Sequence, residues 1–193
     1  MSAGAQLISA PDLHWSSTWE DDVADDEHRV LAALFARCFP RSRTAFTGTR
    51  SWSSGRPELR VVGRLDGRAV AHVGVLRRFL RVAERSASVL VGDVGLVAVD
   101  PDVQGRGFGA QLLGRTASTL HDLELPFGYL TCGDHVAPFY ATAGWMRVDG
   151  GTRMVGVDGR VKVYGGVSMV LPVHAPLQEW PAGCLVDRDG LEI

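Results

Sequence analysis

The sequence predicts a mixed α+β domain, and two observations support this prediction. Residues 59–65, 69–82 and 86–99 have strand-like patterns in direct succession, whereas apolar residues before and after them recur at helical spacing. Strands and helices therefore neither alternate strictly nor fall into separate halves, which is typical of α+β proteins. The chain has 193 residues, the length of one domain, so we expect residues 1–193 to form a single unit.

The first predicted helix follows an acidic stretch. Six of the eight residues from Glu20 to Glu27 are acidic. Acidic side chains interact favourably with the partial positive charge of a helix N-terminus, so we interpret the stretch as a solvated helix start rather than a cation site. The apolar residues of the helix recur with a helical period before Pro40 ends it: Val30, Leu31, Leu34, Phe35, Cys38 and Phe39.

The three strand-like runs predict an antiparallel meander. Between the first and the second run, Asp66-Gly67 is a strong signal for a tight hairpin turn. The third run is rich in valine and contains Gly92 and Gly95. A glycine inside a strand often marks a bulge or a close approach of another segment.

A glycine-rich loop at residues 104–110 separates the meander from a second helix, which Pro126 ends. The apolar stripe of this helix consists of Leu112, Leu113, Ala117, Leu120 and Leu123. Residues 149–159 are predicted to be a glycine-rich connector. The remaining predicted elements are a short helix from Pro138 to Gly144 and strands at residues 127–132, 145–148 and 167–173.

Composition excludes several classes of function. A formal net charge of −2 without a basic stripe argues against a nucleic-acid partner. We expect no membrane partner and a cytoplasmic location, because no apolar run could span a bilayer and the N-terminus lacks the pattern of a signal peptide. Cys38, Cys132 and Cys184 lie far apart, which fits reduced thiols. No ligand spacing among cysteines and histidines predicts a metal.

The glycine-rich loop is the most informative segment. Three glycines between a strand and a helix let backbone N–H groups converge where the helix N-terminus adds partial positive charge, and such a nest binds phosphate oxygens. A Rossmann fingerprint is one interpretation, since Gly105, Gly107 and Ala110 match G-x-G-x-x-A. A purely structural turn is a second, and the pyrophosphate loop of an acyl-coenzyme A enzyme is a third. A Walker A loop is excluded, because no Gly-Lys-Ser/Thr follows.

Two motifs resemble the GNAT superfamily of N-acetyltransferases. Residues 104–109 (QGRGFG) are similar to the family's Q/R-x-x-G-x-G/A signature, and residues 139–145 (FYATAGW) are similar to its F/L-Y-x-x-x-G-F/W segment. The resemblance implies the GNAT fold, a mixed, mostly antiparallel central sheet with flanking helices. It also implies acetyl-CoA as the acyl donor and allows a homodimer.

Two subfamilies resemble the chain more closely. Most of the chain resembles the rhizobial nodulation protein A acyltransferases, in residues 50–52, 56–60, 71–79, 126–128 and 179–183. Parts of the same pattern also resemble the aminoglycoside 2′-N-acetyltransferases. Both subfamilies acylate an amine at position 2 of an amino sugar. The nodulation acyltransferases have a degenerate glycine loop and take long acyl chains from acyl carrier protein, so the intact loop here favours a free acyl-CoA, most simply acetyl-CoA.

The resemblance assigns roles to individual residues. Tyr140 matches the family tyrosine that protonates the departing thiolate. Asp93, in the strand before the loop, is the expected base and is expected to face a polar cleft, with His72 as the alternative base. The backbone of Val97 and Val99 would bind the pantetheine and the oxyanion. The pyrophosphate would lie on Gln104, Gly105, Arg106, Gly107, Phe108, Gly109 and Ala110.

The acceptor is less determined. We expect substrate contacts from Asp134 and His135, and from Glu179 and Trp180, because an amino sugar favours carboxylates and aromatic rings. The charged tail at residues 187–189 could add to them.

The predicted function is acetyl transfer from acetyl-CoA to the amine of an amino sugar, such as the 2′-amine of an aminoglycoside antibiotic, with resistance as the outcome. One alternative is a nodulation-protein-A-like transfer of a fatty acyl chain from acyl carrier protein or acyl-CoA to a glucosamine-type amine. A second alternative is a non-catalytic GNAT-fold sensor of CoA or sugar. A third is a nicotinamide-binding protein.

Overall fold

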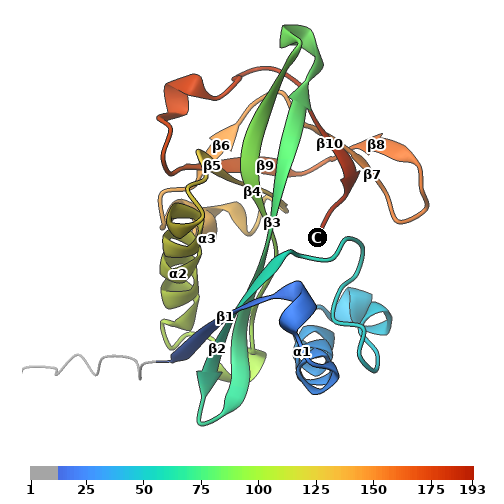
Figure 1. Cartoon of the computed structure of the whole chain (residues 1–193), viewed down its shortest axis with the longest axis vertical. Coiled ribbons are helices and arrows are strands. Elements are labelled where there is room, and N and C mark those ends of the chain that lie inside the picture. Colours follow the sequence, from blue (N-terminus) through green and yellow to red (C-terminus); the bar gives the residue numbers. More distant parts are fainter. Residues whose placement is uncertain (1–12) are drawn as a thin grey trace, which may run out of the picture.

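The computed structural model describes residues 13–193, and a ten-stranded sheet runs through them (Figure 1). Its strands are β1 (His14–Trp19), β2 (Leu59–Leu65), β3 (Arg68–Val82), β4 (Ala87–Val99), β5 (Phe127–Cys132), β6 (Met146–Val148), β7 (Thr152–Val155), β8 (Val161–Val163), β9 (Val167–Pro172) and β10 (Val186–Leu191). The order is β6-β9-β5-β4-β3-β10-β7-β8, and off this path β2 pairs with β3 and β1 pairs with β2. Of the pairs, β4–β5 and β10–β7 are parallel and the others antiparallel, as the fold prediction requires.

The predicted meander is confirmed. β2 and β3 are joined by the expected hairpin turn, in which Asp66 and Gly67 have φ angles of 50° and 80°. Positive φ at both central residues matches the right-handed twist of the flanking strands. β3 and β4 are the two longest strands and run through the middle of the molecule (Figure 1).

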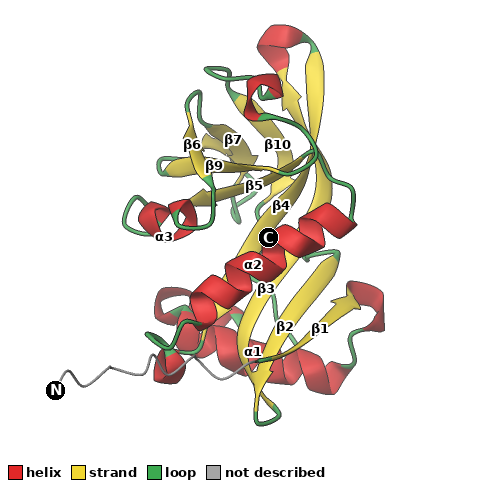
Figure 2. Ribbon diagram, turned by 90° about the vertical axis from the view of Figure 1, so that its left-hand side faces the viewer, coloured by secondary structure: helices red, strands yellow, loops and turns green. Residues whose placement is uncertain are grey.

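Two helices cover opposite faces of the sheet (Figure 2). The helix α1 (Asp25–Cys38) packs on the face that carries Val62, whereas α2 (Phe108–Asp122) packs on the face that carries Val61. Neighbouring strand residues point to opposite faces, so one strand supplies both cores. A short helix, α3 (Ala137–Ala141), lies on the α2 face and contributes Ala137 and Tyr140 to its core.

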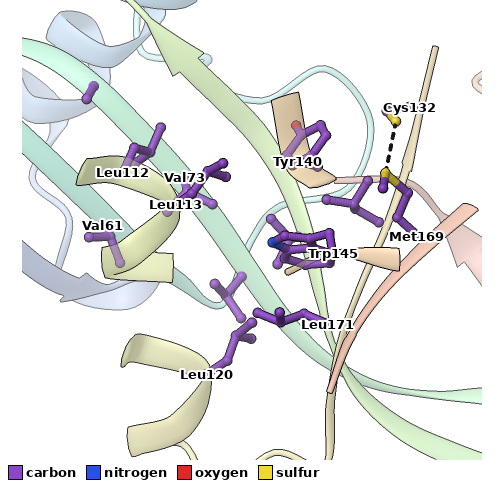
Figure 3. Close-up of a cluster of buried hydrophobic side chains, with 14 of the residues drawn as sticks. Val61, Val73, Leu112, Leu113, Leu120, Cys132, Tyr140, Trp145, Met169 and Leu171 are labelled. Atoms are coloured by element: carbon purple, nitrogen blue, oxygen red, sulfur yellow. Dashed lines mark hydrogen bonds between the residues drawn. The ribbon is translucent and has the colours of Figure 1, made fainter. Parts of the chain in front are cut away.

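The core on the α2 face is built from leucines, valines and aromatic rings (Figure 3). Leu112, Leu113 and Leu120 of α2 are at most 1% exposed, as the predicted apolar stripe requires. The buried rings of Tyr140 and Trp145 lie edge to face beside them, with centroids 6.0 Å apart. This core fixes α2 and α3 relative to the central strands.

Four strands of the sheet differ from the prediction. Residues 149–159, expected to be a connector, contain β7, and β1, β8 and β10 were not predicted. Their side chains explain the difference. β10 buries two charged residues: Asp187, which pairs with Arg153, and Arg188, which pairs with Asp93. Because these buried residues are charged, the strand has no alternating apolar pattern that would predict it. All three residues of β8 are exposed.

The central feature of the sheet is a gap between β4 and β5. The two parallel strands pair only from Val91–Phe127 to Asp93–Tyr129. Beyond these pairs β4 continues along β3, while β5 continues along β9. In the diverging part of β4, Leu96 has a φ of 50°, and the β3–β4 register shifts there, which is a β-bulge.

Among residues 13–193, no helix has the length and apolar character needed to cross a membrane.

Candidate functional site

A pocket of about 400 Å³ opens on the α2 face of the diverging end of β4. It is formed where the end of β4, the glycine loop with the start of α2, and α3 meet. Its lining consists of Val97, Val99, Gln104, Gly105, Phe108, Gly109, Val136, Phe139 and Tyr140. Six of the nine predicted donor-binding residues and the predicted acid, Tyr140, are thus in this lining. The other three, Arg106, Gly107 and Ala110, belong to the glycine loop and the start of α2 beside it.

The glycine loop forms one end of the pocket. Gly105 and Gly107 have φ angles of 76° and 82°, a region that other residues rarely adopt. Gly107 is also the N-cap of α2 and supplies no side-chain cap. The first N–H groups of a helix have no acceptor within the helix, so those of α2 remain available to an anion. Arg106 is exposed, and its guanidinium lies over the ring of Phe108 at 5.2 Å.

The other contacts of the loop fix its position on β4 and α3. The amide of Gln104 donates a hydrogen bond to the backbone oxygen of Val99 at 3.0 Å. A Cβ atom at Gly109 would lie 2.9 Å from the ring of Phe139, so only glycine allows α2 and α3 to approach this closely. Ala110 and Gly107 are outside the pocket lining.

Tyr140 lines the pocket with a largely buried side chain, 7% exposed. Burial raises the pKa of Tyr140 above its usual value, and the nearby Cys132 and Glu192 raise it further. The phenol therefore stays protonated at neutral pH and keeps a proton to donate.

Asp93 is 1% exposed and does not face an open cleft, which corrects the expectation for this residue. Its carboxylate lies between two guanidinium groups: Arg188 Nη2 donates to Oδ1 at 3.1 Å, and Arg78 Nε is 3.1 Å from Oδ2. Burial raises the pKa of Asp93, against the attraction of these two arginines. A carboxylate buried between two arginines mainly stabilises the fold, because an unpaired charge in the same place would lower the free energy of unfolding.

His72 is fully buried on the α1 face, away from the pocket. Its ring packs edge to face on Phe35, and its Nδ1 bonds to the backbone oxygen of Leu96 at 2.9 Å. Burial lowers the pKa of His72 to about 3, and the positive charge of Arg60 lowers it too. The neutral ring thus holds the bulge of β4 in place and has no path to a substrate in the pocket.

The four predicted acceptor residues are not brought together. Asp134 and His135 are exposed in the loop before α3, where Asp134 pairs with Arg147 at 3.0 Å. Trp180 is 3% exposed and stacks on Tyr129 at 5.5 Å, so it is a core residue with no free face for a sugar. Glu179 is exposed beside it and outside the pocket lining.

A polar cluster at the gap was missed by the sequence analysis. The Thr131 hydroxyl, at the end of β5, donates a hydrogen bond to the Glu192 carboxylate. Arg188 Nη2 donates to Thr131 at 3.2 Å, and Arg188 Nη1 lies 3.6 Å from Glu192. Arg188 and Glu192 are four residues apart, but Thr131 is 57 positions from Arg188, so no signal in one sequence could have joined the three.

The comparison with known families identifies the fold and the lineage together. The family model described as nodulation protein A (NodA) matches residues 10–193. The chain belongs to the nodulation protein A family. A curated relative, nodulation protein A from Bradyrhizobium sp. (strain NC92), is 32% identical over 203 residues, which cover 97% of this chain and 95% of that protein.

Solved structures show the same fold at low sequence identity. The GNAT family N-acetyltransferase YhbS from Escherichia coli, in complex with CoA, has a TM-score of 0.58 at 15% identity and covers 92% of this chain and 91% of its own. Escherichia coli ElaA has a TM-score of 0.57 at 18% identity and covers 82% of this chain and 99% of its own. The GNAT fold and the resemblance to nodulation protein A are confirmed, and with them the prediction of an N-acyltransferase.

Two other expectations concern absences. Within residues 13–193, no group of three or more potential ligand side chains could hold a metal ion. The three cysteines are free thiols.

Proposed function

We propose that this nodulation protein A family member transfers an acyl group from a coenzyme A thioester to the amine of a glucosamine-type amino sugar. The observation that carries the proposal is the pocket, which joins the glycine loop, the diverging edge of β4 and Tyr140. Matched relatives are nodulation proteins A, so the family supports the nodulation-type acceptor, and no comparison supports an aminoglycoside acceptor.

The residues of the pocket fit a coenzyme A thioester. The free N–H groups at the start of α2, together with the loop at Gly105 and Gly107, suit a pyrophosphate. Beyond the bulge, the edge of β4 at Val97 and Val99 has no strand partner on the β5 side among residues 13–193. A pantetheine arm can pair with such an edge as an additional strand. The Tyr140 hydroxyl would then donate a proton to the departing sulfur.

A donor and acceptor screen tests the proposal. Purified protein is incubated with one of three donors, acetyl-CoA, palmitoyl-CoA or palmitoyl acyl carrier protein. The acceptors are glucosamine oligomers that carry a free amine, kanamycin-type aminoglycosides, or peptides. Free thiol and product mass are then measured. We expect an amide on the glucosamine oligomers with at least one of the two CoA donors. Transfer to aminoglycosides alone would overturn the acceptor, and transfer from acyl carrier protein but from neither CoA donor would overturn the donor.

A second experiment isolates the pyrophosphate contact. Acyl-pantetheine has the same reacting thioester but lacks the nucleotide and its phosphates. We expect kcat/KM to be about 100-fold lower with acyl-pantetheine than with acyl-CoA, because charge-assisted hydrogen bonds to the loop are lost. Equal values would remove the glycine loop from donor binding.

A further inference from the structure

The last residues of the chain lie against the gap between β4 and β5. A Cβ atom at Gly95 of β4 would be 2.3 Å from the backbone oxygen of Ile193, so the chain end lies directly on this strand. The backbone oxygen of Glu192 accepts a hydrogen bond from Gly55 N at 2.8 Å. Gly95 is two residues beyond Asp93, the last β4 residue that pairs with β5. The segment is therefore held at the point where the two strands separate.

This segment lies on the face of the sheet opposite to α2. Val94 packs in the core beneath α2, so the adjacent Asp93 and Gly95 point to the other face. Tyr129 pairs with Asp93, and Thr131, two residues later on β5, shares its face. Figure 1 shows α2 and the C-terminal end on opposite sides of β3 and β4. The pocket and the Glu192 carboxylate thus approach the gap from opposite faces.

The Glu192 side chain is fixed but open to solvent. Thr131 donates a hydrogen bond to Oε1, and Arg188 Nη1 lies 3.6 Å from the same atom. Arg188 is itself fully buried and held by Asp93 at 3.1 Å. The Glu192 side chain is 37% exposed, so its carboxylate can still accept a hydrogen bond from a ligand.

We propose, on the basis of the acyl transfer proposed above, that the Glu192 carboxylate binds the ammonium group of the acceptor and takes a proton from it. An amine carries a proton at neutral pH and cannot attack a carbonyl carbon until it loses it. A carboxylate at the gap, facing the pocket from the other side, brings the acceptor nitrogen to the thioester.

The charge of Glu192 acts on titratable groups around the gap. Burial is the main cause that raises the pKa of Tyr140, Tyr164 and Cys132, and the Glu192 carboxylate raises each of them further. The charged and titratable groups that interact with Glu192 are Arg188 on β10, Arg78 on β3, Asp93 on β4, Cys132 on β5, Tyr140 on α3, and Tyr164 in a loop.

Glu192 and Tyr140 together account for every proton that moves in the reaction. Glu192 takes one proton from the ammonium group, and the amine lone pair forms the C–N bond. The C–S bond breaks with its electron pair on sulfur, which takes the Tyr140 proton. The second nitrogen proton returns to the Tyr140 phenolate, and Glu192 releases its proton to water. The net products are the amide, free coenzyme A and one proton.

The test compares Glu192→Gln with the matched change Glu124→Gln, which alters an exposed side chain at the C-terminal end of α2. We expect Glu192→Gln to reduce kcat/KM for the amine about 100-fold at pH 7. The deficit should shrink as the pH rises toward the pKa of the amine, because a neutral amine needs no base. Thermal stabilisation by coenzyme A should stay unchanged, because the donor binds on the other face.

The outcomes separate the two proposals. If the wild type acylates no amine, the proposed function fails. If the wild type is active and Glu192→Gln behaves like Glu124→Gln, the assignment of Glu192 fails while the function stands. A loss that is the same at every pH, or that accompanies a lower melting temperature and is not relieved in Glu192→Asp, would overturn the proton transfer and leave only a structural role.

Discussion

Tyr140 lines the pocket, whereas the two other side chains predicted for catalysis, Asp93 and His72, are buried in the sheet. All three are nearly inaccessible to solvent, so burial alone does not separate them. Their partners do: Asp93 is neutralised by two arginines, and His72 bonds to the backbone of β4. The buried phenol of Tyr140 instead lines the pocket together with the glycine loop and the end of β4.

Replacing Tyr140 with phenylalanine removes the proton donor and keeps the ring that packs on Trp145. We expect kcat to fall about 100-fold, with the binding of coenzyme A unchanged in calorimetric titration. Because burial raises the pKa of Tyr140, wild-type kcat should show no loss from phenol ionisation up to pH 9. An unchanged kcat in Tyr140→Phe would remove the residue from the mechanism.

The lowered pKa of His72 makes the free energy of unfolding depend on pH. Its pKa is about 3 in the folded chain and near 6.5 when unfolded, so between these values the unfolded chain binds more protons. Stability is complete above pH 6.5 and falls as the pH drops toward 3, by at most about 1.4 kcal/mol per pH unit from this residue. Urea unfolding of His72→Asn should show a shallower loss between pH 6 and pH 4. An identical slope would mean that other groups cause the acid lability.

At the scale of elements, the position of α2 against α3 sets the width of the pocket. The two helices meet at Gly109 and Phe139, where a Cβ atom would be 2.9 Å from the ring. One turn later, Gly114 lies in the same helix with open space around it. The two glycines therefore have different roles, and the close approach of Phe139 to Gly109 is a contact that the glycine motif alone did not predict.

The matched substitutions Gly109→Ala and Gly114→Ala test this difference. We expect Gly109→Ala to weaken coenzyme A binding about 10-fold, because α2 must move away from α3. Gly114→Ala should leave binding unchanged and raise the free energy of unfolding by about 0.5–1 kcal/mol, since alanine favours a helix interior over glycine. Calorimetric titration and urea unfolding measure both quantities. Equal effects of the two changes would mean that the Gly109–Phe139 contact does not shape the pocket.

At the scale of the whole molecule, the sequence predicted the parts whose chemistry is local. The hairpin at Asp66-Gly67, the glycine loop and the apolar stripe of α2 each have a pattern of their own. The contacts that join distant parts of the chain across the sheet have no such sequence pattern. Arg188 of β10 reaches Asp93 of β4 across 95 positions, and a charged strand in the core contradicts the usual pattern. The acceptor side of the site proposed above depends on such contacts, which no local pattern in the sequence could indicate.

This buried link between β4 and β10 gives a prediction for the whole fold. Asp93→Asn leaves Arg188, fully buried, and Arg78, 12% exposed, without their common carboxylate. Since an uncompensated buried charge is costly, we expect the free energy of unfolding to fall by about 3 kcal/mol. Adding Arg188→Gln to Asp93→Asn should recover part of this loss, and Asp122→Asn on the surface should have no effect. If Asp93→Asn instead abolishes turnover at unchanged stability in urea unfolding, Asp93 is the base after all, because a structural anchor cannot be removed without cost to the fold.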